Sequence, residues 1–211
     1  LMSSQLYNSI APQNEAQLFP VYFVGIGGIG MSALARYFKV MGHPVAGYDK
    51  TPSPLTTKMI EEEGFDIVFA DEEELIPEVF RNRDQVLLVY TPAVPQDNRI
   101  LSWFRGEGFR LYKRAEVLGI ISRDKKAICI AGTHGKTTVS TLTAFLLKNS
   151  GVGCNAFLGG IASNWGSNLL VDPASPYVVI EAAEFDRSFL HLSPEMSVIT
   201  AMDADHLDIY G

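Results

Sequence analysis

Two short glycine-rich loops, each set between an apolar strand and a helical pattern, limit most strongly what this chain can fold into. The first loop spans residues 25–30 and follows the apolar run 21–24. The second spans residues 131–138 and follows the apolar run 127–130. A strand, a glycine-rich turn and a helix in this order present the N–H groups of a helix N-terminus beside a strand end, where phosphates bind. The chain is therefore predicted to be an α/β protein with two phosphate-binding loops.

The first loop has the spacing G-x-G-x-x-G at Gly25, Gly27 and Gly30, and Asp49 ends the next apolar run. This is the fingerprint of a dinucleotide-binding unit, whose glycines permit a tight turn and a close approach of the backbone to a diphosphate. Gly28 belongs to the same loop. The pattern favours NAD(P), FAD or another diphosphate-linked nucleoside and leaves the choice among them open; a glycine turn that only packs is the alternative.

Strands and helices alternate from residue 19 to residue 113, which predicts a Rossmann-like, doubly wound parallel sheet. The run 86–90 is continuously apolar, as in a strand covered on both faces, and Thr91 opens the loop at its carboxyl end, where α/β folds place ligands. The other expected elements are helices over 31–41, 56–63, 72–80 and 98–107 and strands over 45–48, 67–69 and 109–112.

The second loop follows the logic of an ATPase phosphate loop, although Ile130 stands where the usual first glycine would be. In such a loop the lysine, here Lys136, supplies a charge near the β- and γ-phosphates, and the hydroxyl of Thr137 reaches Mg²⁺. We therefore expect this part of the chain to bind ATP or GTP. The expected nucleotide-binding residues are Gly132, Thr133, His134, Gly135, Lys136, Thr137 and Thr138.

A phosphate loop needs acidic partners for its metal ion, and these usually follow neighbouring strands. The candidates, which follow the apolar runs 177–180 and 197–200, are Glu181, Glu184, Asp186, Asp203, Asp205 and His206. Each of them alone could be an ordinary loop residue or a helix cap. Beside Lys136 and Thr137 they form a candidate Mg²⁺ site.

Composition and charge exclude several other classes of protein. The net charge is −7 and there is no long basic block, so nucleic acid is not an expected partner. Two cysteines indicate neither a disulfide scaffold nor a zinc site. No leader peptide or membrane-length apolar run is visible, so we expect a cytoplasmic protein. Residues 1–18 are polar and aperiodic and are expected to form a flexible arm.

Beyond these patterns, the chain resembles the Mur ligase family over nearly its whole length, from Val21 to Gly211. Within the family, it is most similar to the branch that adds alanine. The motifs that carry the resemblance are Gly25–Met31, Arg114–Glu116, Gly132–Thr138, Phe157–Gly160, Glu181–Leu190 and Ala204–Asp208. The resemblance implies a UDP-sugar-binding domain over 19–113, followed by the N-terminal part of a central ATPase domain over 114–211. It also implies that the chain is the N-terminal part of a longer bacterial enzyme.

The resemblance implies a definite reaction in peptidoglycan precursor synthesis. ATP would phosphorylate the lactyl carboxylate of UDP-N-acetylmuramate, and the amine of L-alanine would attack the acyl phosphate to form an amide. Lys136 would stabilise phosphate charge, and Thr137, Glu184 and His206 would ligate Mg²⁺, so that Lys136, Glu184 and His206 are the expected catalytic residues. The diphosphate of the UDP-sugar, rather than NAD, would lie on the first glycine loop.

Some positions depart from the family's usual pattern, and other functions stay open. The family usually has Asp at the position of Ala183 and Asn at that of Ala201, and Ser is common at that of Phe185. One alternative is the related ligase that attaches a recycled peptide to the same nucleotide sugar. Alternatives from other classes are a nicotinamide-dependent oxidoreductase and a nucleotide-binding regulatory module. We expect these 211 residues alone to be inactive in ligation, and the oligomeric state cannot be predicted.

Overall fold

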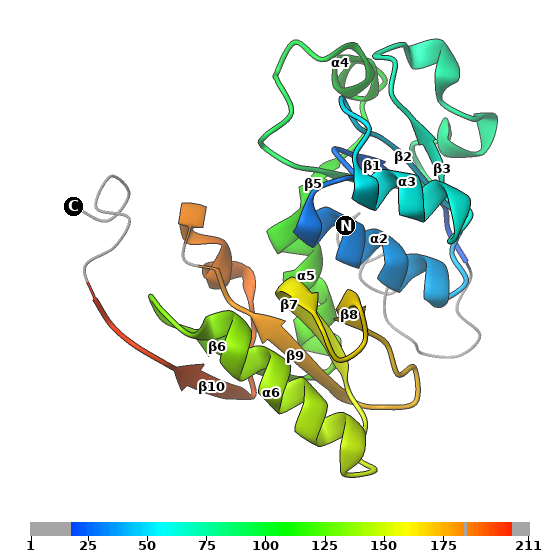
Figure 1. Ribbon diagram of the computed structural model, residues 1–211. Coiled ribbons are helices and arrows are strands. Elements are labelled where there is room, and N and C mark those ends of the chain that lie inside the picture. Colours follow the sequence, from blue (N-terminus) through cyan, green and yellow to red (C-terminus); the bar gives the residue numbers. More distant parts are fainter. Residues whose placement is uncertain (1–17, 184, 204–211) are drawn as a thin grey trace. The chain divides into compact units, whose positions relative to one another are not determined.

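The computed structural model describes residues 18–183 and 185–203, and these divide into two compact units, with the division after Arg114. Apart from Leu18, the arm predicted over residues 1–18 lies outside the described residues. Each unit contains a five-stranded sheet (Figure 1).

The sheet of the first unit is parallel throughout, in the order β3-β2-β1-β4-β5. Its strands are β1 (Val21–Val24), β2 (Val45–Tyr48), β3 (Asp66–Val68), β4 (Leu87–Tyr90) and β5 (Leu111–Lys113). The strand order reverses between β1 and β4, so the loops that follow these two strands part at the carboxyl edge and leave room for a ligand. The predicted doubly wound α/β class is confirmed for this unit.

The helices of the first unit are α2 (Ile29–Val40), α3 (Pro54–Glu61) and α4 (Arg99–Gly106). The starts of α3 and α4 are satisfied by side chains. Ser53 forms a capping box with Thr56, and the N-cap Asn98 accepts a hydrogen bond from the N–H of Leu101 at 2.8 Å. The core between helices and sheet includes Tyr22 and Phe104, which are fully buried.

The helix predicted over residues 72–80 is wrong. The segment contains two separate 3₁₀ turns, η1 (Glu73–Leu75) and η2 (Glu78–Phe80). Pro77 lies between them, lacks an N–H donor and favours the extended backbone of Ile76, which has a ψ of 118°. The strand predicted over 109–112 also begins later, at Leu111, because Phe109 closes the end of α4 by donating its N–H to Phe104 O at 3.0 Å.

Helix α5 (Arg114–Asp124) opens the second unit, although its first residue, Arg114, belongs to the first unit. The second unit contains a mixed sheet in the order β10-β6-β9-β7-β8. Its strands are β6 (Lys126–Ala131), β7 (Asn155–Ala162), β8 (Ser167–Leu170), β9 (Tyr177–Glu181) and β10 (Met196–Ile199). All pairs are parallel except β7 with β8. The sequence prediction missed this antiparallel pair, because Gly159 and Gly160 interrupt the apolar pattern of β7.

Helix α6 (Lys136–Asn149) follows the second glycine-rich loop and lies along the sheet, in contact with β6, β7 and β9 (Figure 1). The 3₁₀ segment η3 (Phe185–His191) precedes β10. Cys129 and Cys154 are free and buried in this unit, and burial raises the pKa of both thiols to about 11. Among the helices of the described residues, none has both the length and the apolar character that a bilayer span requires.

Candidate functional site

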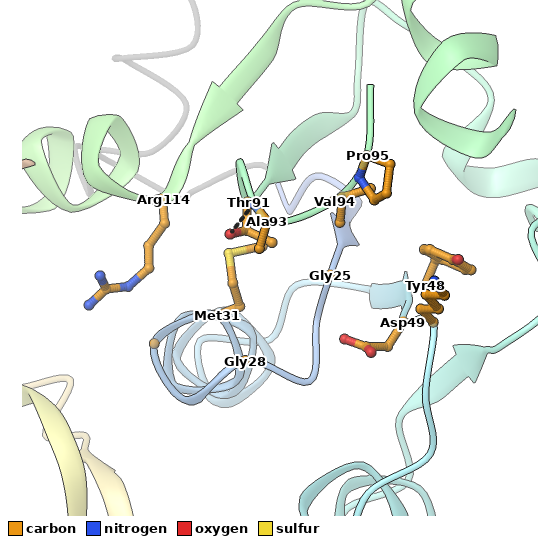
Figure 2. Close-up of a pocket in the computed structure, with 12 residues that line it drawn as sticks. Gly25, Gly28, Met31, Tyr48, Asp49, Thr91, Ala93, Val94, Pro95 and Arg114 are labelled. Carbon is orange, nitrogen blue, oxygen red and sulfur yellow. Dashed lines mark hydrogen bonds between the residues drawn. The ribbon is translucent and has the colours of Figure 1, made fainter. Parts of the chain in front are cut away.

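A pocket of about 390 Å³ lies at the carboxyl edge of the first sheet (Figure 2). It is bordered by the loop after β1, by the end of β2 and by the loop after β4. Of the residues predicted to bind a UDP-sugar, those that line it are Gly25, Gly28, Gly30, Asp49 and Thr91. The parallel topology thus gathers residues that are more than 60 positions apart in the sequence.

Two glycines fix the shape of the first loop. Gly25 has a φ of +89°, and a Cβ at this position would collide with the Thr91 side chain. A Cβ on Gly27 would lie 2.8 Å from Asp49 Oδ2 and 2.8 Å from Thr56 Cγ2. Side chains at either position would therefore force the neighbouring loops apart.

The carboxylate of Asp49 ties this loop to the end of β2. Asp49 Oδ2 accepts a hydrogen bond from the N–H of Gly27 at 2.7 Å, and Oδ1 accepts one from the N–H of Thr51 at 3.2 Å. The N–H groups of Gly25 and Ile26 both donate to Tyr48 O. The first three N–H groups of the glycine loop are therefore hydrogen-bonded within the protein, and Asp49 holds the loop in its conformation.

The pocket also contains two cations that the sequence prediction did not include, Lys50 and Arg114. Arg114 directly follows β5 and begins α5, and its side chain extends toward the helix that carries Met31 (Figure 2). A Cβ on Gly30 would lie 2.6 Å from the guanidinium carbon of Arg114, so the missing side chain makes room for this group. Arg114 belongs to the motif Arg114–Glu116, which was one of those that carried the family resemblance, and this was the signal available in the sequence.

Tyr48, at the end of β2, also lines the pocket. Burial raises the pKa of its phenol, and the nearby Asp71 and Asp49 carboxylates raise it further. The phenol is therefore protonated at neutral pH and remains a hydrogen-bond donor.

In the second unit, the predicted phosphate loop lies between β6 and α6. Gly132 and Gly135 have φ values of +124° and +82°. Lys136, the first residue of α6, turns back and donates from Nζ to Gly132 O at 2.6 Å. The lysine ammonium is thus held over the loop, where it can attract a phosphate oxygen.

Glu181, at the end of β9, connects three parts of this site. Its Oε1 accepts a hydrogen bond from Thr137 Oγ1 at 3.0 Å, and its Oε2 accepts one from the N–H of Gly159 in β7 at 2.9 Å. A Cβ on Gly159 would collide with this carboxylate. The prediction named Glu181 as a candidate but assigned the metal to Glu184.

The donors of this cluster fit a magnesium ion. Mg²⁺ prefers hard oxygen ligands and is usually held by one or two protein oxygens together with phosphate oxygens and water. The hydroxyl of Thr137 and the carboxylate of Glu181 are donors of this kind beside the phosphate loop. Within residues 18–183 and 185–203, no group of three or more His, Cys, Asp or Glu residues could hold a metal by itself.

The other side of the phosphate loop contacts the segment after β10. Thr133 Oγ1 accepts a hydrogen bond from the N–H of Asp203 at 3.2 Å, and His134 Nε2 lies 3.6 Å from Asp203 Oδ2. The hydroxyl of Thr200 donates to Ala131 O at 3.1 Å and also to His134 O. Asp203 and Thr200 therefore join the loop; Asp203 was one of the candidate metal ligands, whereas Thr200 was not predicted.

Several of the predicted residues are not brought into this network by the described contacts. Thr138 lies exposed in the first turn of α6. Glu184, Asp205 and His206 lie outside the described residues, and the candidate Asp186 lies in η3.

Comparison with known families gives two matches that together cover most of the chain. The model described as "Mur ligase family, catalytic domain" matches residues 20–126, and the "Mur ligase middle domain" matches residues 130–211.

Curated relatives at high identity share one name. The chain is 59% identical over 191 residues to the UDP-N-acetylmuramate–L-alanine ligase of Porphyromonas gingivalis strain W83, covering 90% of this chain and 42% of the relative. It is 51% identical over 201 residues to the protein of that name from Cytophaga hutchinsonii, covering 94% and 43%. The chain thus spans less than half the length of these relatives.

Two solved structures have similar folds. A ligase of UDP-N-acetylmuramate and L-alanyl-γ-D-glutamyl-meso-diaminopimelate from Neisseria meningitides matches with a TM-score of 0.79 and 25% identity, covering 92% of this chain and 64% of that one. The UDP-N-acetylmuramate-alanine ligase from Thermotoga maritima matches with a TM-score of 0.77 and 30% identity, covering 92% and 44%.

Proposed function

Because this chain belongs to the Mur ligase family, we propose that it serves the ATP-dependent joining of L-alanine to UDP-N-acetylmuramate in peptidoglycan precursor synthesis. The observation that carries the proposal is that each unit has its own glycine loop with nearby cations, in a chain 51–59% identical to ligases of that name. One unit would bind the nucleotide sugar and the other would bind ATP.

The proposed reaction proceeds in two steps. The lactyl carboxylate of the sugar attacks the γ-phosphorus of ATP, which gives an acyl phosphate and releases ADP. The amine of L-alanine then attacks the acyl carbon, phosphate leaves, and an amide bond forms after the amine loses a proton. Since two anions must meet in the first step, the protein's main task is to offset charge and to align the reactants.

The second unit's residues would do this work at the phosphate loop. Lys136 would move its ammonium from Gly132 O to the β- and γ-phosphate oxygens, and the loop N–H groups from His134 to Lys136 would hold these oxygens in place. Mg²⁺, held by Thr137 with the carboxylates beside it, would neutralise phosphate charge. We retain Glu184 and His206 as proposed ligands of this ion, and Thr133, His134 and Thr138 as proposed nucleotide contacts.

In the first unit, the diphosphate of the UDP-sugar would lie in the pocket beside Gly28, Gly30 and Thr91. The hydrogen bonds of Asp49 argue against a nicotinamide dinucleotide, because the acidic residue of such a site binds the ribose hydroxyls. Here both carboxylate oxygens of Asp49 accept backbone N–H groups. The substrates are anionic nucleotides of the cell interior, and we propose the bacterial cytoplasm as the location.

A second candidate is attachment of a recycled peptide to the same sugar. The structure of such a ligase from Neisseria meningitides supports this candidate, because its TM-score of 0.79 is close to the 0.77 of the alanine ligase from Thermotoga maritima. Its identity of 25% is less than half that of the curated alanine-adding relatives, and for this reason we prefer L-alanine.

Isothermal titration calorimetry of the 211-residue chain with UDP-N-acetylmuramate and with NADH tests the proposal. We expect saturable binding of the UDP-sugar that is competed by UDP, and no binding of NADH at the same concentrations. Binding of NADH together with silence toward the UDP-sugar would refute the proposed function.

A further inference from the structure

We infer that Arg114 is a diphosphate-binding residue of the pocket in the first unit, and that Gly30 lacks a side chain to let its guanidinium reach this place. The inference rests on the proposed function, since it concerns how the pocket binds a nucleoside diphosphate. It assigns to Arg114 the role that a dinucleotide-binding loop usually gives to its first N–H groups.

The first step concerns the N–H groups of the glycine loop. Those of Gly25 and Ile26 donate to Tyr48 O at 2.7 and 3.0 Å, and that of Gly27 donates to Asp49. Because these donors are engaged, a diphosphate must be bound by groups beyond Gly27. The groups that line the pocket and could bind it are the start of α2, the hydroxyl-bearing Thr91 and the cations Lys50 and Arg114.

The second step concerns the start of α2. A helix N-terminus carries a partial positive charge, which protein side chains usually offset with a cap or an acidic residue. The N-cap of α2 is Gly28, it makes no side-chain cap hydrogen bond, and the first turn contains no acidic residue. The described starts of α3 and α4, by contrast, are capped by Ser53 and Asn98.

The third step concerns the guanidinium itself. Arg114 Nη2 would lie 3.0 Å from a Cβ on Gly30, in the first turn of α2. A cation at this end of a helix is disfavoured by the helix dipole, and an anion that contacts both groups turns this repulsion into attraction. A guanidinium also matches a phosphate in shape, because its planar donors can bind two oxygens at once.

The fourth step concerns the charge of the pocket. The charged side chains that line it are Asp49, Lys50 and Arg114. The chain as a whole has a net charge of −7, so an anionic ligand depends on local cations. With the Asp49 carboxylate engaged by two N–H groups, Arg114 and Lys50 provide this local field.

The experiment compares wild type, Arg114→Ala and Arg114→Lys in the 211-residue chain, with UDP measured by calorimetry and uridine measured by ligand-observed NMR. We expect Arg114→Ala to bind UDP roughly 10- to 100-fold more weakly, since hydrogen bonds to charged groups contribute about 1.5–3 kcal/mol. Uridine binding should be unchanged, and the UDP affinity of Arg114→Lys should lie between those of wild type and Arg114→Ala. Arg123→Ala, which removes the same charge from the exposed end of α5, is the matched control and should bind UDP like wild type.

Gly30→Ala tests the same inference without removing the charge. Its added methyl would displace the guanidinium, so Gly30→Ala alone should bind UDP more weakly than wild type. The double variant with Gly30→Ala and Arg114→Ala should bind UDP no more weakly than Arg114→Ala alone. Gly106→Ala, where a Cβ meets nothing within 4 Å, is the control for an added methyl in a helix. If Arg114→Ala is too unstable to study, Gly30→Ala alone decides the matter by its effect on UDP and not on uridine.

The outcomes separate this inference from the proposed function. Wild type that fails to bind UDP refutes both. Wild type that binds UDP, with Arg114→Ala and Gly30→Ala unchanged, refutes the role of Arg114 alone. An equal loss for UDP and uridine also overturns it, because a general disturbance of the pocket would then explain the data.

Discussion

At the scale of single residues, the contact between Thr137 and Glu181 governs what the phosphate loop can offer to a metal-bound nucleotide. The Thr137 hydroxyl donates its hydrogen to Glu181 Oε1, so the lone pairs of its oxygen stay available to a cation, and the carboxylate adds negative charge nearby. We expect Glu181→Gln to weaken binding of ADP in the presence of Mg²⁺ by about tenfold, or about 1.4 kcal/mol. Binding in EDTA should be unchanged. Calorimetry with and without Mg²⁺ measures both.

The control for this variant is Glu195→Gln, which neutralises an exposed carboxylate of the same unit. It should leave both affinities at the wild-type value. An equal loss with and without Mg²⁺ in Glu181→Gln would mean that the carboxylate only supports the loop, through its hydrogen bond with Gly159.

At the scale of the elements, α5 packs closely against the end of η3 and the segment that follows it. Gly119 lies in the middle of α5, and a Cβ there would collide with His191 O. One helical turn after Gly119, Ser122 Oγ accepts a hydrogen bond from the N–H of Ser193 at 3.0 Å. We expect Gly119→Ala to destabilise the second unit by about 1–2 kcal/mol, because the overpacking cost of about 1–3 kcal/mol exceeds the gain in helix propensity of about 1 kcal/mol.

Urea unfolding followed by circular dichroism measures this effect. Gly106→Ala in α4 gains propensity without a collision, and it should be neutral or slightly stabilising. If the two variants had the same stability, the close packing of α5 against His191 would not contribute to the fold.

At the scale of the whole molecule, the phosphate loop of the second unit is open to solvent. Gly135 and Thr137 are exposed, and the matched ligases are more than twice as long as the segment that this chain covers. Water screens the field of Lys136 and hydrolyses an acyl phosphate. We therefore expect the 211 residues alone to bind the UDP-sugar but to release ADP without dependence on L-alanine. A coupled ADP assay beside the full-length Porphyromonas gingivalis ligase tests this, and alanine-dependent turnover near the ligase rate would contradict it.

The local pattern of the sequence was sufficient for the α/β class and for the two loops. Each loop is encoded in one short continuous segment, Val21–Val40 or Lys126–Asn149, by an apolar strand, by glycines such as Gly25 and Gly135 that adopt positive φ, and by the helix that follows. Such signals depend on neighbours in the chain, so they can be read without knowing the fold. The error at residues 72–80 was also local, since Pro77 was there to indicate the break.

What the tertiary structure alone decided is which distant side chains meet at these loops. Arg114 is 84 positions from Gly30, and Glu181 is 44 positions from Thr137, as the sequence numbering shows. The order of the strands in each sheet brings them together, and this order results from packing between elements that share no sequence pattern. The sequence by itself determined where the two glycine loops lie, and the folded chain determined which carboxylate and which cation stand beside them, because strand pairing acts through space and not along the chain.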